Sequence, residues 1–260
     1  MNYLKIKTVF NEMNEFEEEL KKTIIRELEI AESIFNDVRD ELSKSVVFSR
    51  MDESINDSKI PGFTTVKKGK GEVGDFIALV FDIRNSTDHL IHRISQGNAK
   101  VSQLERVYYE TTAINTLGIV LVNKHKGRIT EFLGDGFLAL FPAKEKDQVY
   151  VAHRTAKDCL IYLQSIVNPI LQERYNLPEL KIGIGLAYSK AIVTLIGVGD
   201  DVHAKAIGEC IYRASKLSKG YNEVRVDDQL KMFWPTSKGG TLKFIEIANV
   251  NLKFKGYKIT

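Results

Sequence analysis

Apolar side chains recur at every third or fourth position in the first part of the chain. Over residues 11–43 these positions are Met13, Phe16, Leu20, Ile24, Leu28, Ile34 and Val38. This spacing is that of one face of a helix. We therefore predict an amphipathic helix over residues 1–43, with its apolar stripe packed on the rest of the protein or on a second subunit.

The pattern then alternates between strand-like and helix-like segments. Pro61, Gly62 and the lysine-rich stretch KKGKGEVG indicate a linker over residues 44–74, which is followed by a catalytic domain over 75–260. In that domain we expect a strand at 76–82, a helix at 103–124, two strands meeting at 134–136, a helix at 148–170, apolar runs at 181–189 and 191–199, a helix at 208–219, and short strands near 224, 242 and 252. This order predicts an α+β fold with a ferredoxin-like-related sheet and helices packed on it.

The composition narrows the class of protein. The 260 residues, 43% of them hydrophobic, are enough for one substantial core. The 37 basic residues nearly balance the 34 acidic ones, which argues against a nucleic-acid partner. Cys159 and Cys210 form no metal-type pair, the first residues lack the apolar stretch of a signal peptide, and no run reaches the roughly 18 apolar residues of a membrane span. We expect a reduced, cytoplasmic protein with no membrane span.

Two aspartates stand out within strand-like surroundings. Asp82 lies in FDIRNST and Asp135 lies in EFLGDGFLALF, at a glycine-flanked hairpin turn. Mg²⁺ and Mn²⁺ take hard oxygen ligands and usually only one or two protein carboxylates, with water and substrate phosphates completing the shell. A carboxylate that ends a buried strand is costly unless it is paired or metal-bound. The alternative for Asp135 is a solvated turn aspartate.

Five segments, in order, resemble the class III nucleotidyl cyclase family over residues 75–258. They are FDIRNST, GRITEFLGDGFLALF, KIGIGLAYSKAIVTLIG, IGECIYRASKLSKG and FKGYK. The resemblance implies a cyclase homology domain that works as a homodimer with interfacial active sites. It also implies conversion of a nucleoside triphosphate to its 3′,5′-cyclic monophosphate and pyrophosphate with two divalent cations (Mn²⁺ or Mg²⁺) per site, held by Asp82, Asp135 and the main-chain carbonyl of Ile83.

The base-reading positions depart from familiar members of this family. Adenylate cyclases have lysine and aspartate there and guanylate cyclases have glutamate and cysteine, whereas this chain has Glu131 and Lys205. A glutamate beside a lysine suits the N–H and carbonyl of uracil or guanine, and a mismatched buried polar pair leaves groups unsatisfied at roughly 1–3 kcal/mol each. The alternative is that the two side chains pair with each other or with solvent.

Two positions on the following helix favour uracil. Tyr212 stands where the family has a ribose-positioning asparagine, and Lys216 stands where it has the transition-state arginine. A tyrosine narrows the pocket toward a single-ring base, which is typical of the pyrimidine cyclases of bacterial Pycsar anti-phage defence. The alternative for Tyr212 is an ordinary core residue. Arg213, about 100° around the helix, is expected at the surface or in an interface.

Further residues are expected to contact the triphosphate. Arg84 and Thr87 belong to a turn whose backbone amides are suited to phosphate, although Ser86 replaces the family's phenylalanine in this turn. Lys255 matches a lysine that reaches the terminal phosphates, or else is merely solvated.

The sequence thus predicts a UTP cyclase that makes cyclic UMP as a second messenger for a separate downstream effector. The alternatives are a guanylate or cytidylate cyclase and a non-catalytic, nucleotide-binding regulator.

Overall fold

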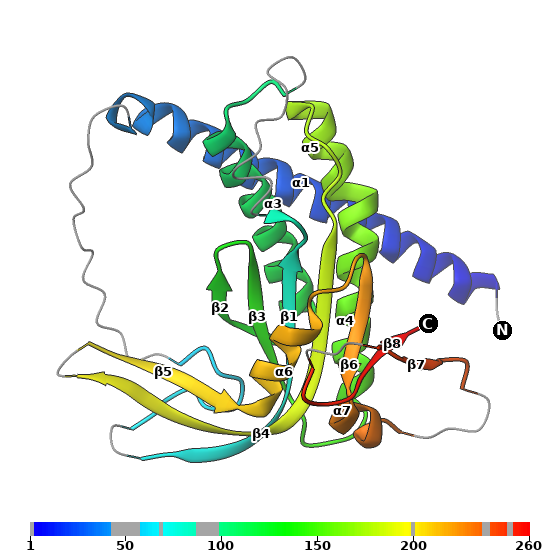
Figure 1. The fold of residues 1–260 in the computed structure, drawn as a ribbon. Helices are drawn as coiled ribbons and strands as arrows, with labels where there is room; N and C mark the ends of the chain where they lie inside the picture. Colours follow the sequence, from blue (N-terminus) through cyan, green and yellow to red (C-terminus); the bar gives the residue numbers. More distant parts are fainter. Residues whose placement is uncertain are drawn as a thin grey trace. The chain divides into compact units, whose positions relative to one another are not determined.

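The structure, a computed structural model, describes residues 3–42, 58–67, 70–86, 99–198, 201–235, 240–248 and 252–260. The chain divides into two compact units (Figure 1). Unit 1 comprises Met1–Phe48, Thr87–Val120 and Ile161–Glu179, and unit 2 comprises Ser49–Ser86, Leu121–Leu160 and Leu180–Thr260. The candidate chemistry described below lies in unit 2.

Unit 1 is helical. It contains α1 (Tyr3–Leu42), most of α3 (Gln103–Lys124), the π-helical turn η1 (Leu163–Val167) and α5 (Asn168–Tyr175). A π-helical turn therefore interrupts the single helix expected over 148–170, and α4 (Gln148–Tyr162) ends before it.

The apolar stripe of α1 is buried. Leu20, Ile24 and Leu28 are at most 1% exposed. On the same helix Glu32 accepts hydrogen bonds from the Arg174 guanidinium (2.8 Å) and the Tyr175 hydroxyl (2.5 Å) of α5. The stripe therefore packs within the chain itself, while the side chains of Ile34 and Val38 lie outside the described set.

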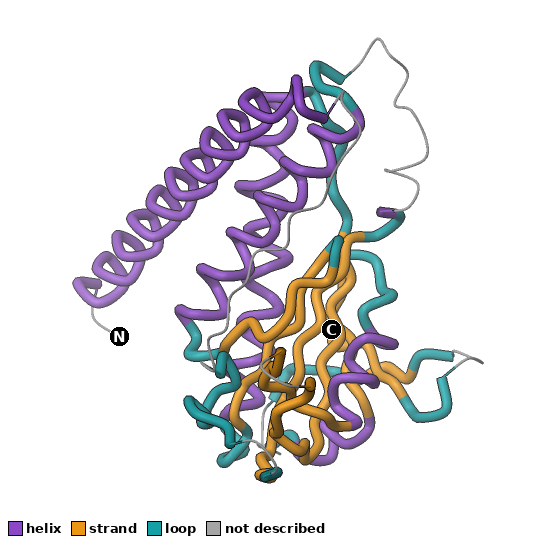
Figure 2. The backbone as a smooth tube through the Cα atoms, turned by 90° about the vertical axis from the view of Figure 1, so that its left-hand side faces the viewer, coloured by secondary structure: helices purple, strands orange, loops and turns teal. Residues whose placement is uncertain are grey.

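Unit 2 is built on one mixed sheet. Its strand order is β2-β3-β1-β4-β6-β8-β7, with β5 paired to β4. The strands are β1 (Glu72–Ile83), β2 (Arg128–Leu133), β3 (Gly136–Pro142), β4 (Ile182–Val198), β5 (Asp201–Gly208), β6 (Glu223–Asp227), β7 (Phe244–Glu246) and β8 (Gly256–Ile259). Helices α6 (Glu209–Leu217) and α7 (Asp228–Phe233) pack against these strands (Figure 2). The predicted α+β fold is confirmed.

The two apolar runs expected as separate segments after α5 differ from the prediction. The runs at 181–189 and 191–199 form one long strand, β4, because Ser189 and Lys190 continue the antiparallel ladder with β1 opposite Phe76 and Asp75. The β4–β5 hairpin that follows was not predicted, since its polar and apolar residues mix without a clear period.

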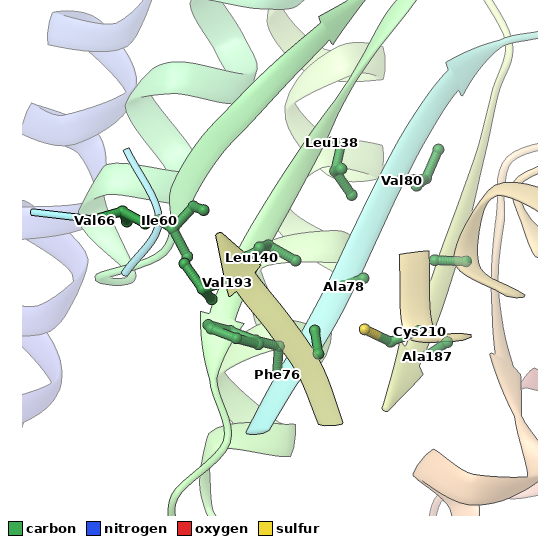
Figure 3. Packing of buried hydrophobic residues seen from close by; sticks show 12 residues of the cluster. Ile60, Val66, Phe76, Ala78, Val80, Leu138, Leu140, Ala187, Val193 and Cys210 are labelled. Carbon is green, nitrogen blue, oxygen red and sulfur yellow. The ribbon is translucent and has the colours of Figure 1, made fainter. Parts of the chain in front are cut away.

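A hydrophobic cluster joins the sheet to α6 (Figure 3). Alternate residues of β1, β3 and β4 point into it because successive side chains of a strand face opposite sides. Its members are Ile60, Val66, Phe76, Ala78, Val80, Leu138, Leu140, Ala187, Ala191, Val193, Cys210 and Ala214. This cluster anchors α6, which carries Tyr212 and Lys216, to the strands that carry the two aspartates.

Close packing of α6 requires glycine on β4. A Cβ atom at Gly185 would lie 2.0 Å from the main-chain oxygen of Ala214, and one at Gly183 would lie 1.9 Å from that of Ser218. Neither backbone oxygen can move without shifting the helix.

Gly185→Ala is predicted to lower the free energy of unfolding by about 3 kcal/mol, the upper range for overpacking a tight contact. Urea denaturation of the purified protein measures this loss. Gly71→Ala is the control, because its Cβ would meet only the Cγ2 atom of Ile192, at 3.3 Å. Equal stability of the two variants would show that α6 does not depend on this approach.

Candidate active site

Strand pairing brings the two predicted metal-binding aspartates together. Asp82, next to last in β1, is the register partner of Gly136, the first residue of β3. Asp135 directly precedes Gly136 in the β2–β3 turn, and its main-chain oxygen accepts a hydrogen bond from the Ile83 amide at 3.1 Å. The end of β1 and the hairpin turn therefore place both carboxylates at one end of the sheet.

The carboxylates act on each other electrostatically. Burial raises the pKa of Asp82, and the negative charge of Asp135 raises it further. Arg84 and Lys219 act in the opposite direction. Because like charges held near each other disfavour ionisation, a divalent cation between the two groups would relieve their repulsion.

Residues of the turn after β1 hold both aspartates. The Ser86 hydroxyl donates a hydrogen bond to Oδ2 of Asp135, and Nη1 of Arg84 donates to Oδ2 of Asp82 at 2.9 Å. The serine that departs from the family pattern therefore orients a carboxylate directly. Thr87 lies outside the described residues, so its predicted role stays a prediction.

The donor set suits Mg²⁺ or Mn²⁺. It contains two carboxylates, which are hard oxygen ligands, and the main-chain carbonyl of Ile83 stays a predicted third ligand. Within the described ranges no group of three or more His, Cys, Asp or Glu side chains is placed to hold a metal by itself. A cation at Asp82 and Asp135 would therefore complete its shell with water or substrate oxygen.

Glu131 and Lys205 contact each other. Oε1 of Glu131, on β2, lies 2.9 Å from Nζ of Lys205, on β5, with the side chains 32% and 39% exposed. In the structure as described, the two side chains thus satisfy each other, which is the simpler of the two sequence-based interpretations. A pair this exposed contributes only about 0–1 kcal/mol, so a ligand can open it at little cost.

Tyr212, which is exposed, and Lys216, which is half-buried, form a second pair, on α6. Tyr212 is 57% exposed, which excludes the core role considered for it. Nζ of Lys216 lies 5.5 Å from the centre of its ring, within cation–π range. Both side chains are available to a ligand at the surface of this helix.

The surface position, one of the two places expected for Arg213, is not what the structure shows. Its side chain is only 16% exposed and pairs with Asp228 at 2.7 Å, with the buried Asp227 at 3.3 Å and with Glu209 at 3.0 Å. Its guanidinium also lies 4.9 Å from the centre of the Phe254 ring. Arg213 therefore links α6 to α7 and to the FKGYK segment. It has a structural role because the buried carboxylate of Asp227 requires a cation beside it.

Lys255 follows Phe254 and is exposed. Its ammonium lies 3.6 Å from Glu246. The predicted residues thus gather in four places: the carboxylates with Arg84, Glu131 with Lys205, Tyr212 with Lys216, and Lys255 with Glu246.

Two residues beside Asp82 were missed in the sequence. The Tyr221 hydroxyl donates to Oδ1 of Asn85 at 2.9 Å, and the Lys219 charge lowers the pKa of Asp82. Both belong to the connection between α6 and β6. Lys219 lies within the motif IGECIYRASKLSKG and Tyr221 directly follows it, but the sequence does not show that they approach the site, because the parallel pairing of β6 with β4 brings them there.

Solved structures of nucleotide cyclases share this architecture. The guanylyl cyclase Cya2 aligns with a TM-score of 0.60 and 18% identity, over 73% of this chain and 93% of that one. The chain has the class III cyclase fold. The adenylyl cyclase CyaB from P. aeruginosa gives a TM-score of 0.58 at 14% identity, over 74% of this chain and 96% of its own. A bacterial light-regulated adenylyl cyclase gives 0.59 at 18%, over 74% and 53%.

At these identities the likeness to cyclases concerns the fold. No protein-family model and no curated protein sequence matches the chain. None of the described helices combines the length and apolar character needed to cross a bilayer.

Asp82→Asn is predicted to make the metal-free cyclase fold more stable at neutral pH. Because the pKa of Asp82 is raised on folding, the protonated form favours the folded state, and this contribution is lost as pH rises above about 3.8. In thermal denaturation with a chelator present, the variant should have a higher melting temperature than the parent at neutral pH. The two melting temperatures should be equal under acid conditions.

Asp201→Asn is the matched control, since the Asp201 side chain is 91% exposed. Its stability should stay within about 0.5 kcal/mol of the parent at every pH. An Asp82→Asn variant that is less stable at neutral pH would contradict the electrostatic description of the site.

Proposed function

We propose that the protein is a nucleotidyl cyclase that converts a nucleoside triphosphate to its 3′,5′-cyclic monophosphate and pyrophosphate. The observation that carries this proposal is the convergence of Asp82 and Asp135 at one end of a sheet with the class III cyclase fold. Burial, and next the Asp135 charge, raise the pKa of Asp82, so its charged form is costly in the folded state, and a cation-dependent reaction gives a reason for it.

Each part of the site has a defined task in this reaction. Asp82, Asp135 and the Ile83 carbonyl would hold two divalent cations, Mn²⁺ or Mg²⁺. When bound, these supply Lewis-acid activation of the ribose 3′-hydroxyl and charge neutralisation at the leaving pyrophosphate. The hydrogen bond from Ser86 keeps the Asp135 carboxylate oriented for binding these cations. The remaining catalytic work is positioning of the nucleotide.

Cationic side chains bind the phosphates in this proposal. Lys216 provides positive charge at the α-phosphate, as a point donor without the fork of an arginine. Lys255 reaches the terminal phosphates, and its exposed ion pair with Glu246 is weak enough to be exchanged. Arg84 and Thr87 complete the phosphate contacts at the turn after β1.

The favoured base is uracil. Glu131 offers an acceptor and Lys205 a donor within 2.9 Å of each other, which suits the adjacent N3–H and O4 of uracil. Tyr212, exposed beside Lys216, narrows the space for a two-ring base. Guanine presents a similar N–H and carbonyl edge, and Glu131 together with the fold shared with Cya2 makes a guanylate cyclase the second candidate.

We further propose a homodimer with active sites at the subunit interface. Val73, Ile192 and Ile207 are register partners across β1, β4 and β5, and all three are at least half exposed. A contiguous apolar row on a sheet surface marks a protein contact. In the cytoplasm of a bacterium, the cyclic UMP product would act on a separate effector in anti-phage defence.

Incubation with each of the four ribonucleoside triphosphates and Mn²⁺, followed by mass-resolved product identification, tests the proposal. Cyclic UMP from UTP is expected as the main product. Asp82→Ala and Asp135→Ala should each lower its formation at least about a thousandfold, because charge stabilisation at the phosphates is lost.

Asp201→Ala is the control and should keep full activity. Turnover of GTP or ATP without UTP would overturn the base assignment. Undiminished activity of either site variant would overturn the site.

The double variant Glu131→Lys/Lys205→Asp is predicted to move preference from UTP to CTP, since Tyr212 still limits the pocket to a single-ring base. It reverses donor and acceptor, and two mismatched polar contacts change the kcat/KM ratio by about a hundredfold or more. The exchange Lys144→Asp/Glu145→Lys, at exposed positions between β3 and α4, is the matched control. An unchanged UTP to CTP ratio in the site variant would show that the pair does not read the base.

A further inference from the structure

Arg84 places a cation of the chain itself against the candidate metal site. Nη1 of its guanidinium lies 2.9 Å from Oδ2 of Asp82, and the two side chains are 18% and 29% exposed. Nε of the same guanidinium is buried and has no hydrogen-bond partner among the residues that the structure describes. The chain itself therefore places one positive charge against Asp82, while one buried donor of Arg84 has no partner within the described residues.

The position of this guanidinium is built by several contacts. Its carbon lies 5.3 Å from the centre of the Tyr221 ring, and the Tyr221 hydroxyl donates to Asn85. Asn85 has a positive φ of 59°, and the Arg84 amide donates to the main-chain oxygen of Lys181 at 2.7 Å. The Tyr221 ring, the turn at Asn85 and the main-chain hydrogen bond to Lys181 together hold Arg84 beside Asp82. An arginine on an open surface has no such contacts.

A divalent cation and this guanidinium would share the Asp82 carboxylate. Asp82 has two carboxylate oxygens, and Arg84 occupies Oδ2. A metal that binds through Oδ2 would have to displace a charge-assisted hydrogen bond, and a metal that binds through Oδ1 would still meet a second positive charge nearby. Resting on the proposed function, we infer that Arg84 is a resident counter-cation that opposes metal binding until the nucleotide arrives.

The displaced guanidinium has a natural new partner. Arginine carries five N–H donors in a planar fork that matches phosphate oxygens, and the unpartnered Nε is already available. Triphosphate entering with the cations gives Arg84 a replacement for Asp82. Metal and nucleotide consequently bind with positive coupling, which must be reciprocal.

Titration of the nucleotide-free full-length protein with Mn²⁺, followed by the electron paramagnetic resonance signal of free Mn²⁺, tests this inference without any activity measurement. Arg84→Met keeps the apolar contact with Tyr221 and removes the charge. It is expected to bind Mn²⁺ about tenfold tighter, as a charge-assisted hydrogen bond no longer has to be displaced. Arg84→Gln should behave likewise and guards against a folding defect in the first variant.

Two variants distinguish direct competition for Oδ2 of Asp82 from electrostatic repulsion that acts over a longer distance. Arg84→Lys keeps the charge and should stay within about threefold of the parent. Lys219→Gln removes a charge that acts on Asp82 over a distance, and should change affinity by about twofold or less. Equal effects of Lys219→Gln and Arg84→Met would contradict competition for Oδ2.

The same titration distinguishes failure of this inference from failure of the proposed function. Asp82→Ala should abolish the Mn²⁺ site. If Mn²⁺ binding depends on Asp82 but is unchanged or weaker in both Arg84→Met and Arg84→Gln, the counter-cation role is wrong and the metal site stands. If Asp82→Ala leaves binding unchanged, or no variant binds Mn²⁺, the site and the function built on it are both wrong.

Discussion

Antiparallel pairing of β1 with β3 forces two carboxylates into one small region of the sheet end. The ladder sets Asp82 opposite Gly136 and ties the Ile83 amide to the main-chain oxygen of Asp135. Neither aspartate can leave without breaking main-chain hydrogen bonds, so their repulsion is built into the fold. The chemistry proposed for this protein depends on that constraint.

The surroundings moderate this repulsion without removing it. Arg84 contacts Asp82, Ser86 contacts Asp135 and the Lys219 charge acts from the next loop, yet the pKa of Asp82 is still raised, chiefly by burial. A site of this kind is compatible with folding, and the proposed function gives it cations to bind. Such local cost at a functional centre, offset by a well-packed core elsewhere, is a general feature of enzymes.

The fold was predictable wherever the signal is local. The stripe on α1, the β1 strand and the hairpin around Asp135 follow from periodicity and turn residues. The continuity of β4 through Ser189 and Lys190 was not predictable, because only the ladder with β1 makes these polar residues part of a strand. Long-range pairing overrides local preference in such cases.

The same distinction applies to the candidate site. Asp82, Asp135 and Glu131 belong to recognisable motifs, whereas the contact between Glu131 and Lys205 requires β5, and that of Arg84 with Tyr221 requires the loop before β6. Arg213 was misplaced because its partners, Asp227 and Asp228, come from a later strand and helix. Sequence patterns indicate the candidate chemical groups, and tertiary contacts decide which of these groups lie together.

Anomalous diffraction from crystals grown with Mn²⁺ and a non-cyclisable UTP analogue tests the central claim most directly. The account predicts two manganese peaks between the carboxylates of Asp82 and Asp135, with the triphosphate beside them and the uracil edge against a Glu131–Lys205 pair. Manganese bound elsewhere, or two carboxylates that turn away from the metal and the nucleotide, would contradict it.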